Sequence, residues 1–448
     1  MNSSNSLDDR RRPAPADIAT LPSSFPVRHG SQDIPRVDRH AGPPLRKDAA
    51  SHTGPDQPAW FDAFVNGDIP TSPLALPHVC NWCMRNKEPE ALLWVLERTK
   101  TPDLTVPNLN DDQSTVLFKA LVGNTILEEL SFCRTTFTED TARLLGNVLS
   151  TSNRLTHIGL HEPQFIGSAL SVLAEGLRSD SGLRSVALLG CNLDGSDWQT
   201  IVASLKNHQS LEAISIDEPK LPPDAAVIFQ YIIDNPKIRE VTMRNIPLTA
   251  KDAATIARHL ANNPPLKRLV LDAADLDSSG GSDIAGALVN NSTLEALSLA
   301  NNRLGPDFGV ACSRLLETNN TLESLVLEKN QLGEQGIGLI ADALKKNRKL
   351  AAIDLDRTGI NEHSGLAIAG MLAENATLSE LNISHNQCGD KAGRAILASL
   401  GSNTSMQALY YTECGFSDDS RIALANVTQR NKEARQGRER NAMLVDAV

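Results

Sequence analysis

Residues 294–305 read LEALSLANNRLG, and residues 322–333 read LESLVLEKNQLG. Both stretches place apolar residues in the pattern L-x-x-L-x-L, and they begin 28 residues apart. In both directions from this pair, the pattern recurs at a step of 28 residues, with one step of 27. A motif that keeps its register through so many copies indicates a stack of like units, each burying its apolar side against its neighbours. The eleven starts are Leu127, Leu155, Leu183, Leu211, Ile238, Leu266, Leu294, Leu322, Leu350, Leu378 and Met406.

Each unit combines two periodicities. The L-x-x-L-x-L part alternates like a short strand, and a polar, glycine-rich turn follows it. A helix-spaced run comes next, as in GIGLIADALKKN from Gly336. Asparagine recurs where these helices should end, and because it tolerates the left-handed conformation, we expect it to cap them. The positions are Asn291, Asn319, Asn347, Asn375 and Asn403, and a poorer copy of the strand pattern, LTVPNL, begins at Leu104.

The full motif L-x-x-L-x-L-x-x-N-x-L resembles the ribonuclease-inhibitor class of leucine-rich repeats, from about Leu104 to about Asn426. The resemblance implies an α/β fold: a leucine-rich-repeat solenoid (horseshoe) with parallel strands on the concave face and helices on the convex face. In this family the motif asparagine bonds the backbone of neighbouring turns. It is present as Asn302, Asn330 and Asn386. Other residues fill this position in the first half, so we expect looser turns there.

The two ends of the chain differ from the repeats. Residues 1–58 are rich in Ser, Pro, Asp, Arg and Gly, which predicts a disordered arm, either a secretion signal or a plain flexible tail. Residues 59–126 hold most of the tryptophans and the helix-spaced run EPEALLWVLERT, typical of a helical cap. The predicted organisation is therefore an arm at 1–58, a cap at 59–126, a solenoid at 127–426 and a C-terminal capping helix at 427–448.

Composition narrows the class of protein. The formal net charge of −11 argues against a nucleic-acid partner, which would need a basic face. No stretch approaches the ~20 apolar residues of a membrane span, and the polar N-terminus lacks the apolar core of a Sec signal peptide. Seven cysteines at irregular spacing predict no disulfide framework and a reducing compartment.

The concave face is the predicted functional surface. Strand side chains alternate, so the second, fourth and sixth residues after each first leucine should face the concavity. In the later repeats these positions form an acidic stripe with an aromatic end, which we expect to bind a basic segment of a partner protein. We expect the protein itself to be a monomer. The alternative is a solvated polar surface without a partner. The predicted partner-binding residues are Asp272, Glu328, Asp354, Asp356, Glu380 and Tyr410.

Exposure on this face leads to a specific expectation. Replacing Asp354 and Asp356 by arginine should abolish binding and leave the melting temperature nearly unchanged, because both side chains should lie outside the core.

Three groups of residues have side chains that are capable of chemistry. Cys80 and Cys83 form a C-x-x-C without a second ligand pair, so cap residues are favoured over a metal or redox site. His157 and His161 share a strand face, again with few nearby ligands. Asp354 with Asp356 lies on an open face that cannot tune carboxylate pKa values for acid–base work. We therefore predict no catalytic residue, no metal and no cofactor: the protein is not expected to be an enzyme.

The polar N-terminus, the cap and helices with a Gly286-Ala287-Leu288 pattern resemble bacterial type III secreted repeat effectors of the GALA type. This resemblance implies that the protein is an effector that acts on a host protein. The effector would be secreted by a non-Sec route into the host-cell cytoplasm, and if it is not secreted we expect it to be cytoplasmic. GALA-type effectors carry an F-box, and the Leu76-Pro77 start of a helical segment raises an alternative. Residues 70–100 would then dock a host ubiquitin ligase. A third hypothesis is an enzyme hidden in residues 59–126.

Overall fold

The computed structural model describes residues 76–99, 102–178, 182–219 and 225–445. The predicted arm at 1–58 and the first part of the predicted cap lie outside the described residues. Thr53–Val448 form one compact unit, which contains all of the described residues. None of its described helices is both long and apolar enough to span a membrane.

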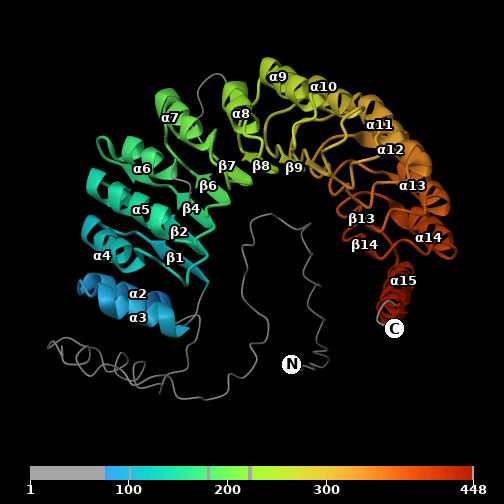
Figure 1. Ribbon diagram of the computed structural model, residues 1–448. Helices are drawn as coiled ribbons and strands as arrows, with labels where there is room; N and C mark the ends of the chain where they lie inside the picture. Colours follow the sequence, from blue (N-terminus) through green and yellow to red (C-terminus); the bar gives the residue numbers. More distant parts are fainter. Residues whose placement is uncertain (1–75, 100–101, 179–181, 220–224, 446–448) are drawn as a thin grey trace, which may run out of the picture. The chain divides into compact units, whose positions relative to one another are not determined.

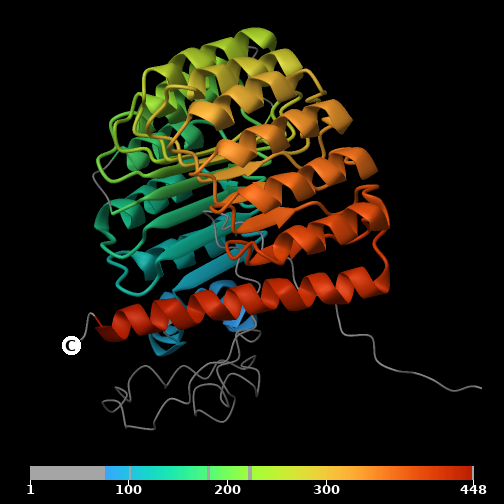
Figure 2. The ribbon, with the colours of Figure 1, turned by 90° about the vertical axis from the view of Figure 1, so that its right-hand side faces the viewer.

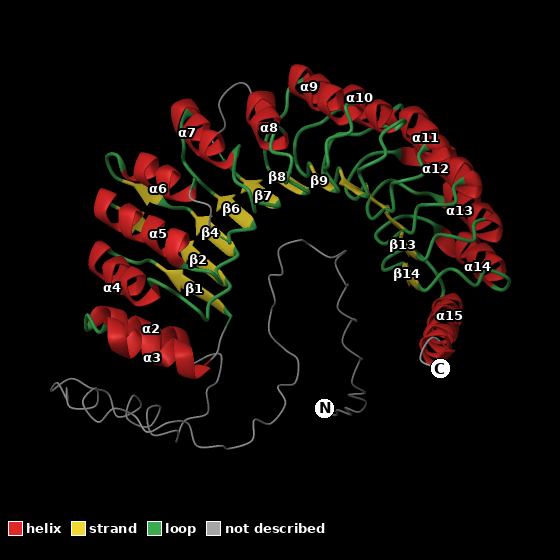
Figure 3. Cartoon of the chain, viewed as in Figure 1, coloured by secondary structure: helices red, strands yellow, loops and turns green. Residues whose placement is uncertain are grey.

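Twelve strands of the described residues form one parallel sheet, in the order of the chain (Figures 1 and 3). The predicted α/β solenoid, with its units stacked in sequence order, is confirmed. The strands are β1 (Asp103–Pro107), β2 (Glu129–Cys133), β4 (His157–His161), β6 (Ser185–Leu189), β7 (Ala213–Asp217), β8 (Glu240–Arg244), β9 (Arg268–Val270), β10 (Ala296–Ser298), β11 (Ser324–Val326), β12 (Ala352–Asp354), β13 (Glu380–Asn382) and β14 (Ala408–Tyr410).

A helix follows each strand of the sheet on the outer side of the curve (Figures 1 and 3). Parallel strands lie ~4.8 Å apart whereas packed helices need ~10 Å, so this arrangement bends the stack toward its strands. The helices are α4 (Asp111–Leu121), α5 (Glu139–Thr151), α6 (Ala169–Leu177), α7 (Gly195–Leu205), α8 (Ala225–Ile233), α9 (Ala250–Ala261), α10 (Ser278–Leu288), α11 (Phe308–Thr318), α12 (Gly333–Lys346), α13 (Glu362–Glu374), α14 (Gly389–Leu400) and α15 (Asp418–Val445).

The pattern leucines form a continuous core between sheet and helices. In β10 and β11, Leu297 is in register with Leu325, and both side chains are buried. Their strand neighbours, such as Ser324, point to the opposite, concave side. The intervening polar residues therefore form the inner wall that the sequence predicted.

At both ends of the stack, the structure differs from the predicted domain boundaries. Strand β1 pairs with β2, with Asp103 opposite Glu129, so the stack begins one unit before residue 127. Two helices, α2 (Leu76–Arg85) and α3 (Pro89–Thr99), precede it. At the other end, the last repeat helix and the predicted cap are one continuous helix, α15, which crosses the end of the stack (Figure 2).

The asparagines at the helix ends act differently from the prediction. Asn319, which ends α11, has φ −76° and ψ 131°, so it is extended rather than left-handed. Its Nδ2 donates to the carbonyl oxygens of Leu288 (2.7 Å) and Asn291 (2.8 Å) of the preceding unit. Its Oδ1 accepts from the backbone of Thr321 and Leu322. These asparagines therefore join consecutive units through their side chains.

The left-handed residue lies elsewhere, just beyond each strand. Its backbone N–H continues the ladder to the next unit, as from Lys329 to the carbonyl of Asp356 (2.7 Å), while its positive φ turns the chain away. One such residue belongs to each of the twelve strands: Asn108, Arg134, Glu162, Gly190, Glu218, Asn245, Ala273, Asn301, Lys329, Arg357, His385 and Glu413.

The expectation of looser turns in the first half is not met where Thr135 and Pro163 replace the motif asparagine. There the two turns pair through backbone as short strands β3 (Thr136–Phe137) and β5 (Gln164–Phe165). The N–H of Gln164 donates to the Thr135 carbonyl at 3.0 Å. Backbone pairing thus replaces the side-chain ladder, and the turns stay regular.

Candidate functional site

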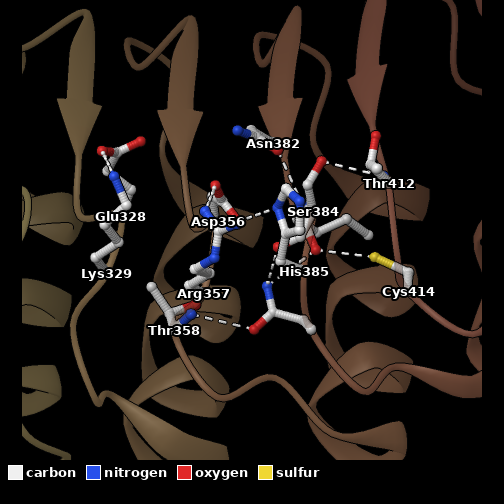
Figure 4. Close-up of polar contacts among 12 residues, drawn as sticks. Glu328, Lys329, Asp356, Arg357, Thr358, Asn382, Ser384, His385, Thr412 and Cys414 are labelled. Atoms are coloured by element: carbon white, nitrogen blue, oxygen red, sulfur yellow. Dashed lines mark hydrogen bonds and ion pairs between the residues drawn. The ribbon is translucent and has the colours of Figure 1, made fainter. Parts of the chain in front are cut away.

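The predicted acidic stripe lies on the concave face, and most of it is contiguous. Asp354 on β12 is in register with Asn382 on β13, which is in register with Tyr410 on β14. Glu380 lies on β13, while Glu328 and Asp356 follow β11 and β12 (Figure 4). Asp272 follows β9 and so lies apart from this group by the width of β10. The structure therefore brings five of the six predicted residues together.

Asp356 is buried, in contrast to the exposed position that the sequence predicted. It is 7% exposed. One carboxylate oxygen accepts from Nδ1 of His385 at 2.8 Å, and the other pairs with Arg357 at 3.1 Å. Two basic groups from neighbouring left-handed turns thus surround this carboxylate (Figure 4). Asp356 holds the turns together more than it faces a partner.

Two further acids of the stripe also have basic partners. Glu328 pairs with Lys329 at 3.2 Å. Asp272 pairs with Nε of Arg244 at 3.2 Å and accepts a short hydrogen bond from the hydroxyl of Ser298. Much of the negative charge that the sequence pattern predicted is therefore balanced within the protein.

Asp354 and Glu380 remain without a basic partner among the described residues. Asp354 accepts from the backbone N–H of Asp356 (2.9 Å) and from the Asn382 amide (3.1 Å), both neutral donors. Burial raises the pKa of Asp354 to about 6, and repulsion from Glu328 and Asp356 adds to this effect. This half-buried carboxylate is therefore the least stabilised charge of the stripe.

Glu380 and Tyr410 form the edge of the same group. Partial burial raises the pKa of Glu380 above its usual value, and a hydrogen bond from the Tyr410 hydroxyl opposes the rise. Burial raises the pKa of Tyr410, and the neighbouring Glu380 reinforces it. We call Asp354, Glu380 and Tyr410 the acidic end of the concave face. It offers two carboxylates and one aromatic ring to a cationic group.

The turn residues Lys329, Arg357 and His385 adjoin the acids in the sequence, but the strand pattern does not predict that they pair with them. Each lies one residue beyond a concave position and has a left-handed backbone, with φ between 51° and 53°. The basic residues were visible as a row with a spacing of 28, a signal that predicts partial neutralisation of the stripe. Ser298, the fourth residue after Leu294, was not singled out by the sequence.

The cysteines of the C-x-x-C are core residues of the cap. Cys80 and Cys83 lie on α2 with fully buried side chains, and burial raises the pKa of both thiols to about 12. Such thiols are poor nucleophiles and poor metal ligands. Across the described ranges, no group of three or more His, Cys, Asp and Glu side chains is placed to hold a metal ion.

Two other cysteines replace the motif asparagine and keep part of its role. Cys191 and Cys414 are buried. The Cys414 thiol donates to the carbonyl of Ile383 at 2.9 Å, and Asn386 donates to the same carbonyl from its amide at 2.9 Å (Figure 4). The Cys191 thiol reaches the Leu160 carbonyl only at 3.8 Å. A weak donor thus substitutes for a strong one.

His157 and His161 lie on one face of β4, as predicted. Nδ1 of His157 is 2.8 Å from the hydroxyl of Thr156, and burial lowers the pKa of His161. Their surroundings on the concave face add no third ligand within the described part of the chain. The pair belongs to the inner wall.

Comparison with known proteins agrees with this geometry. A family model described as Leucine Rich repeat matches residues 318–341 and 374–397. A search of curated proteins found no match.

Solved structures with some similarity were also found. The yeast Rad7–Elc1 complex structure is 15% identical, covering 80% of this chain and 89% of that chain, with a TM-score of 0.40. Leiomodin-1 Actin-Binding Site 2 is 22% identical, covering 45% and 99%, with a TM-score of 0.32. The tropomodulin C-terminal domain of Caenorhabditis elegans is 14% identical, covering 42% and 99%, with a TM-score of 0.30.

The assignment of the fold rests on the repeat geometry and on the family match. Parallel strands in chain order, buried pattern leucines and side-chain ladders between units all recur along the stack. Together they identify the described unit as a leucine-rich-repeat solenoid.

Proposed function

We propose that this solenoid is a protein-binding scaffold and that its acidic end receives a basic segment of the partner. The observation that carries the proposal is the contrast among the concave acids. Glu328, Asp356 and Asp272 have basic partners within the protein, whereas among the described residues Asp354 and Glu380 are hydrogen-bonded only by neutral groups. Two half-buried carboxylates without a counter-charge favour the approach of a cation.

Tyr410 adds to this preference. A guanidinium or ammonium group beside the two carboxylates would lie within reach of the Tyr410 ring, and aromatic faces attract cations. The same ring provides an apolar surface that a partner can cover, as interface anchors commonly do. An arginine-rich peptide segment fits this combination of charge and aromatic surface.

A fluorescent arginine-rich peptide of about twelve residues, alternating Arg and Ala, tests the proposal by fluorescence anisotropy with the full chain. Replacing Asp354 by Asn together with Glu380 by Gln should weaken binding by about tenfold at low salt. A matched control replaces Asp140 and Asp342, exposed acids on α5 and α12, by Asn, which changes the net charge equally. The control should bind the peptide as the wild type does.

Two outcomes would contradict the proposal. Equal loss of affinity in both double variants would mean that only net charge matters. Unchanged affinity in the variant of Asp354 and Glu380 would place the site elsewhere on the surface.

We further propose that the partner is a host protein and that the chain is a type III secreted effector, acting in the host cytoplasm. The support is the resemblance of the repeat helices and of the polar N-terminal composition to such effectors. Full-length chain expressed in a bacterium with a type III system should reach the cytoplasm of contacted host cells. Removing residues 1–58 should abolish delivery, and delivery that persists without the secretion system would contradict the proposal.

The F-box-like adaptor is the alternative, with the helical cap as the part that would dock the ligase. Helices α2 and α3 pack as a pair beside β1 and α4, with Arg85, Lys87 and Glu90 exposed. Direct binding of the full chain to a purified F-box-binding subunit of a host ubiquitin ligase tests this role. Binding should be lost on replacing Arg85 by Glu and Glu90 by Arg. Absence of binding by the wild-type chain would rule the adaptor role out.

A further inference from the structure

Asn382 lies at the centre of the acidic end, among Asp354, Glu380 and Tyr410. It is in register with Asp354 on one side and with Tyr410 on the other, and Glu380 lies two residues before it on β13. Asn382 is buried, at 8% exposed, whereas the three residues around it are partly exposed. A ligand of the acidic end would contact those three residues, and Asn382 is placed to act on the ligand through them.

Two hydrogen bonds fix the orientation of the Asn382 amide. Its Oδ1 accepts from the backbone N–H of Ser384 at 3.0 Å (Figure 4). Since a backbone N–H can only donate, the amide oxygen has to face Ser384, and the NH₂ group faces away from it. Its Nδ2 then donates to Oδ2 of Asp354 at 3.1 Å. The amide therefore presents a donor to the carboxylate.

Both oxygens of the Asp354 carboxylate are held by the protein. Oδ1 accepts from the backbone N–H of Asp356 at 2.9 Å, and Oδ2 accepts from Asn382. Two donors on different oxygens oppose rotation of the carboxylate about its Cβ–Cγ bond. Each oxygen has two lone pairs, so each keeps an acceptor site beyond these two contacts. Asp354 thus offers one acceptor site on each oxygen, in a plane that the protein fixes.

The stack itself does not require an amide at this position. Asn382 is the fourth residue after Leu378, and the equivalent residues of β9 and β11 are Val270 and Val326. These strands pair in the same register as β13 does, so an apolar side chain is compatible with the sheet here. The contact of Asn382 with Asp354 therefore has a role other than stacking the units.

A fixed carboxylate distinguishes between the two basic side chains of proteins. A guanidinium carries its N–H groups in a planar fork and can donate to both oxygens of one carboxylate at once. An ammonium is a compact charge, and its attraction depends little on the orientation of the carboxylate plane. Holding the plane in advance therefore lowers the cost of binding a guanidinium and gives an ammonium little benefit.

We propose that Asn382 is a positioning residue, which holds the Asp354 carboxylate for a two-point contact with a guanidinium, so that the acidic end selects arginine over lysine. The inference rests on the proposed function in taking the acidic end as the binding site. It adds the class of side chain that this site prefers and the residue that sets the preference.

Nuclear magnetic resonance of the full chain tests the proposal at a single carboxylate. The protein carries aspartate labelled with ¹³C at the side-chain carboxyl group, and the Asp354 signal is assigned by its loss in Asp354→Asn. Methylguanidinium and methylammonium are compared at equal ionic strength and at pH 8, above the Asp354 pKa of about 6. The signal should shift saturably with methylguanidinium. Methylammonium should need a roughly fivefold higher concentration for half of its maximal shift.

Asn382→Val tests the positioning role, because it removes the amide donor and introduces the residue found at positions 270 and 326. The response to methylguanidinium should weaken while the response to methylammonium stays, so the preference should disappear. A folding defect would weaken both responses alike and leave their ratio unchanged. Asn320→Val, at an exposed asparagine between α11 and β11, is the matched control and should keep the preference. Asn382→Ala also lacks the donor and repeats the comparison where Asn382→Val folds poorly.

Three results would overturn the proposal. They are the absence of a saturable shift of the Asp354 signal with methylguanidinium, equal responses of the wild type to the two cations, and a preference that persists without the Asn382 amide. None of them depends on the arginine-rich peptide, because the small cations report on Asp354 directly. A peptide that fails to bind, beside an Asp354 that prefers methylguanidinium, would reject the proposed function and leave the role of Asn382 in place.

Discussion

Single residues on the concave face differ in function although their sequence positions are equivalent. Asp354 and Asp356 are two residues apart, but within the part of the chain that the structure describes only Asp356 has basic partners, His385 and Arg357. Asp354 is bonded by neutral donors. The first carboxylate is available to a ligand, whereas the second connects two neighbouring turns of the protein.

The pKa of Asp354 makes its effect on stability depend on pH. Burial raises this pKa to about 6, above the ~3.9 of an unfolded aspartate, so the native state holds the proton more tightly. The contribution of Asp354 to the free energy of unfolding is therefore full below pH ~4 and lost as pH rises through 6. Asp354→Asn cannot ionise and should escape this loss.

Urea unfolding at pH 4.5 and pH 8 checks this prediction. Relative to wild type, the free energy of unfolding of Asp354→Asn should be higher at pH 8 than at pH 4.5 by about 1 kcal/mol. The comparison between pH values removes the constant effect of altered contact with Asn382. A difference of zero or of opposite sign would mean that Asp354 is not destabilised by ionisation in the native state.

Burial of Asp356 changes the expectation for its replacement by arginine. The sequence predicted an exposed side chain and an unchanged melting temperature for a double arginine variant. Because Asp356 is 7% exposed and lies between Arg357 and His385, Asp356→Arg should instead lower the free energy of unfolding by roughly 2–4 kcal/mol. Asp342→Arg, on an exposed face of α12, is the control, and thermal unfolding compares the two. Equal melting temperatures would restore the original expectation.

At the scale of elements, the repeat pattern was enough to predict strands, helices and their order. Eleven pattern starts gave eleven strands, because each buried leucine fixes the register of its unit. The joints between elements were less predictable. Asparagine at the helix ends suggested a left-handed cap, but its amide instead bonds the unit before it, at a distance of 28 or 31 residues. Side-chain partners so far apart in sequence depend on the packing.

The acidic stripe shows the same limit. Alternation along the strands placed Asp354, Glu380 and Tyr410 on the concave face. Pairing across turns could not be predicted from alternation, because it depends on how the turns of successive units lie after the units have stacked. The sequence therefore predicts which residues share a face and leaves their charge balance to the three-dimensional arrangement.

Contact between neighbouring helices gives a prediction for one glycine. Gly176 on α6 faces Gly146 on α5, and a Cβ at residue 176 would lie 2.5 Å from the Gly146 Cα. Gly176→Ala should therefore push the helices apart and lower the free energy of unfolding by roughly 1–3 kcal/mol. Gly286→Ala on α10, where nothing lies within 4 Å, is the control. It should be neutral or stabilise by up to ~1 kcal/mol. Chemical denaturation measures both, and similar values would contradict the close approach.

At the scale of the whole repeat unit, each strand–helix pair contacts its immediate neighbours. Helix α15 closes the last pair: Leu424 is fully buried, and the amide of Asn431 donates to the carbonyls of Asn403 and Met406 at 2.9 Å. A stack of this kind transmits a local defect only as far as neighbouring interfaces remain coupled.

Leu424→Ala tests this coupling. The cavity should cost roughly 2–5 kcal/mol, and hydrogen exchange should accelerate mainly in the last units, around β13 and β14. Ile422→Ala on the same helix is the control, since Ile422 is 62% exposed and should be nearly neutral. Equal acceleration along the whole stack, including β1 and β2, would show that the unit unfolds as one.

The helix-end asparagines give the chain a direction. Asn319, Asn347, Asn375 and Asn403 all donate backwards, to carbonyls of the unit already preceding them. A ribosome releases the chain in that same order, so each newly emerged segment finds its acceptors in place. For these helix-end asparagines, growth from the first unit onward therefore supplies each side-chain donor after its acceptors, and synthesis itself can guide the formation of these joints.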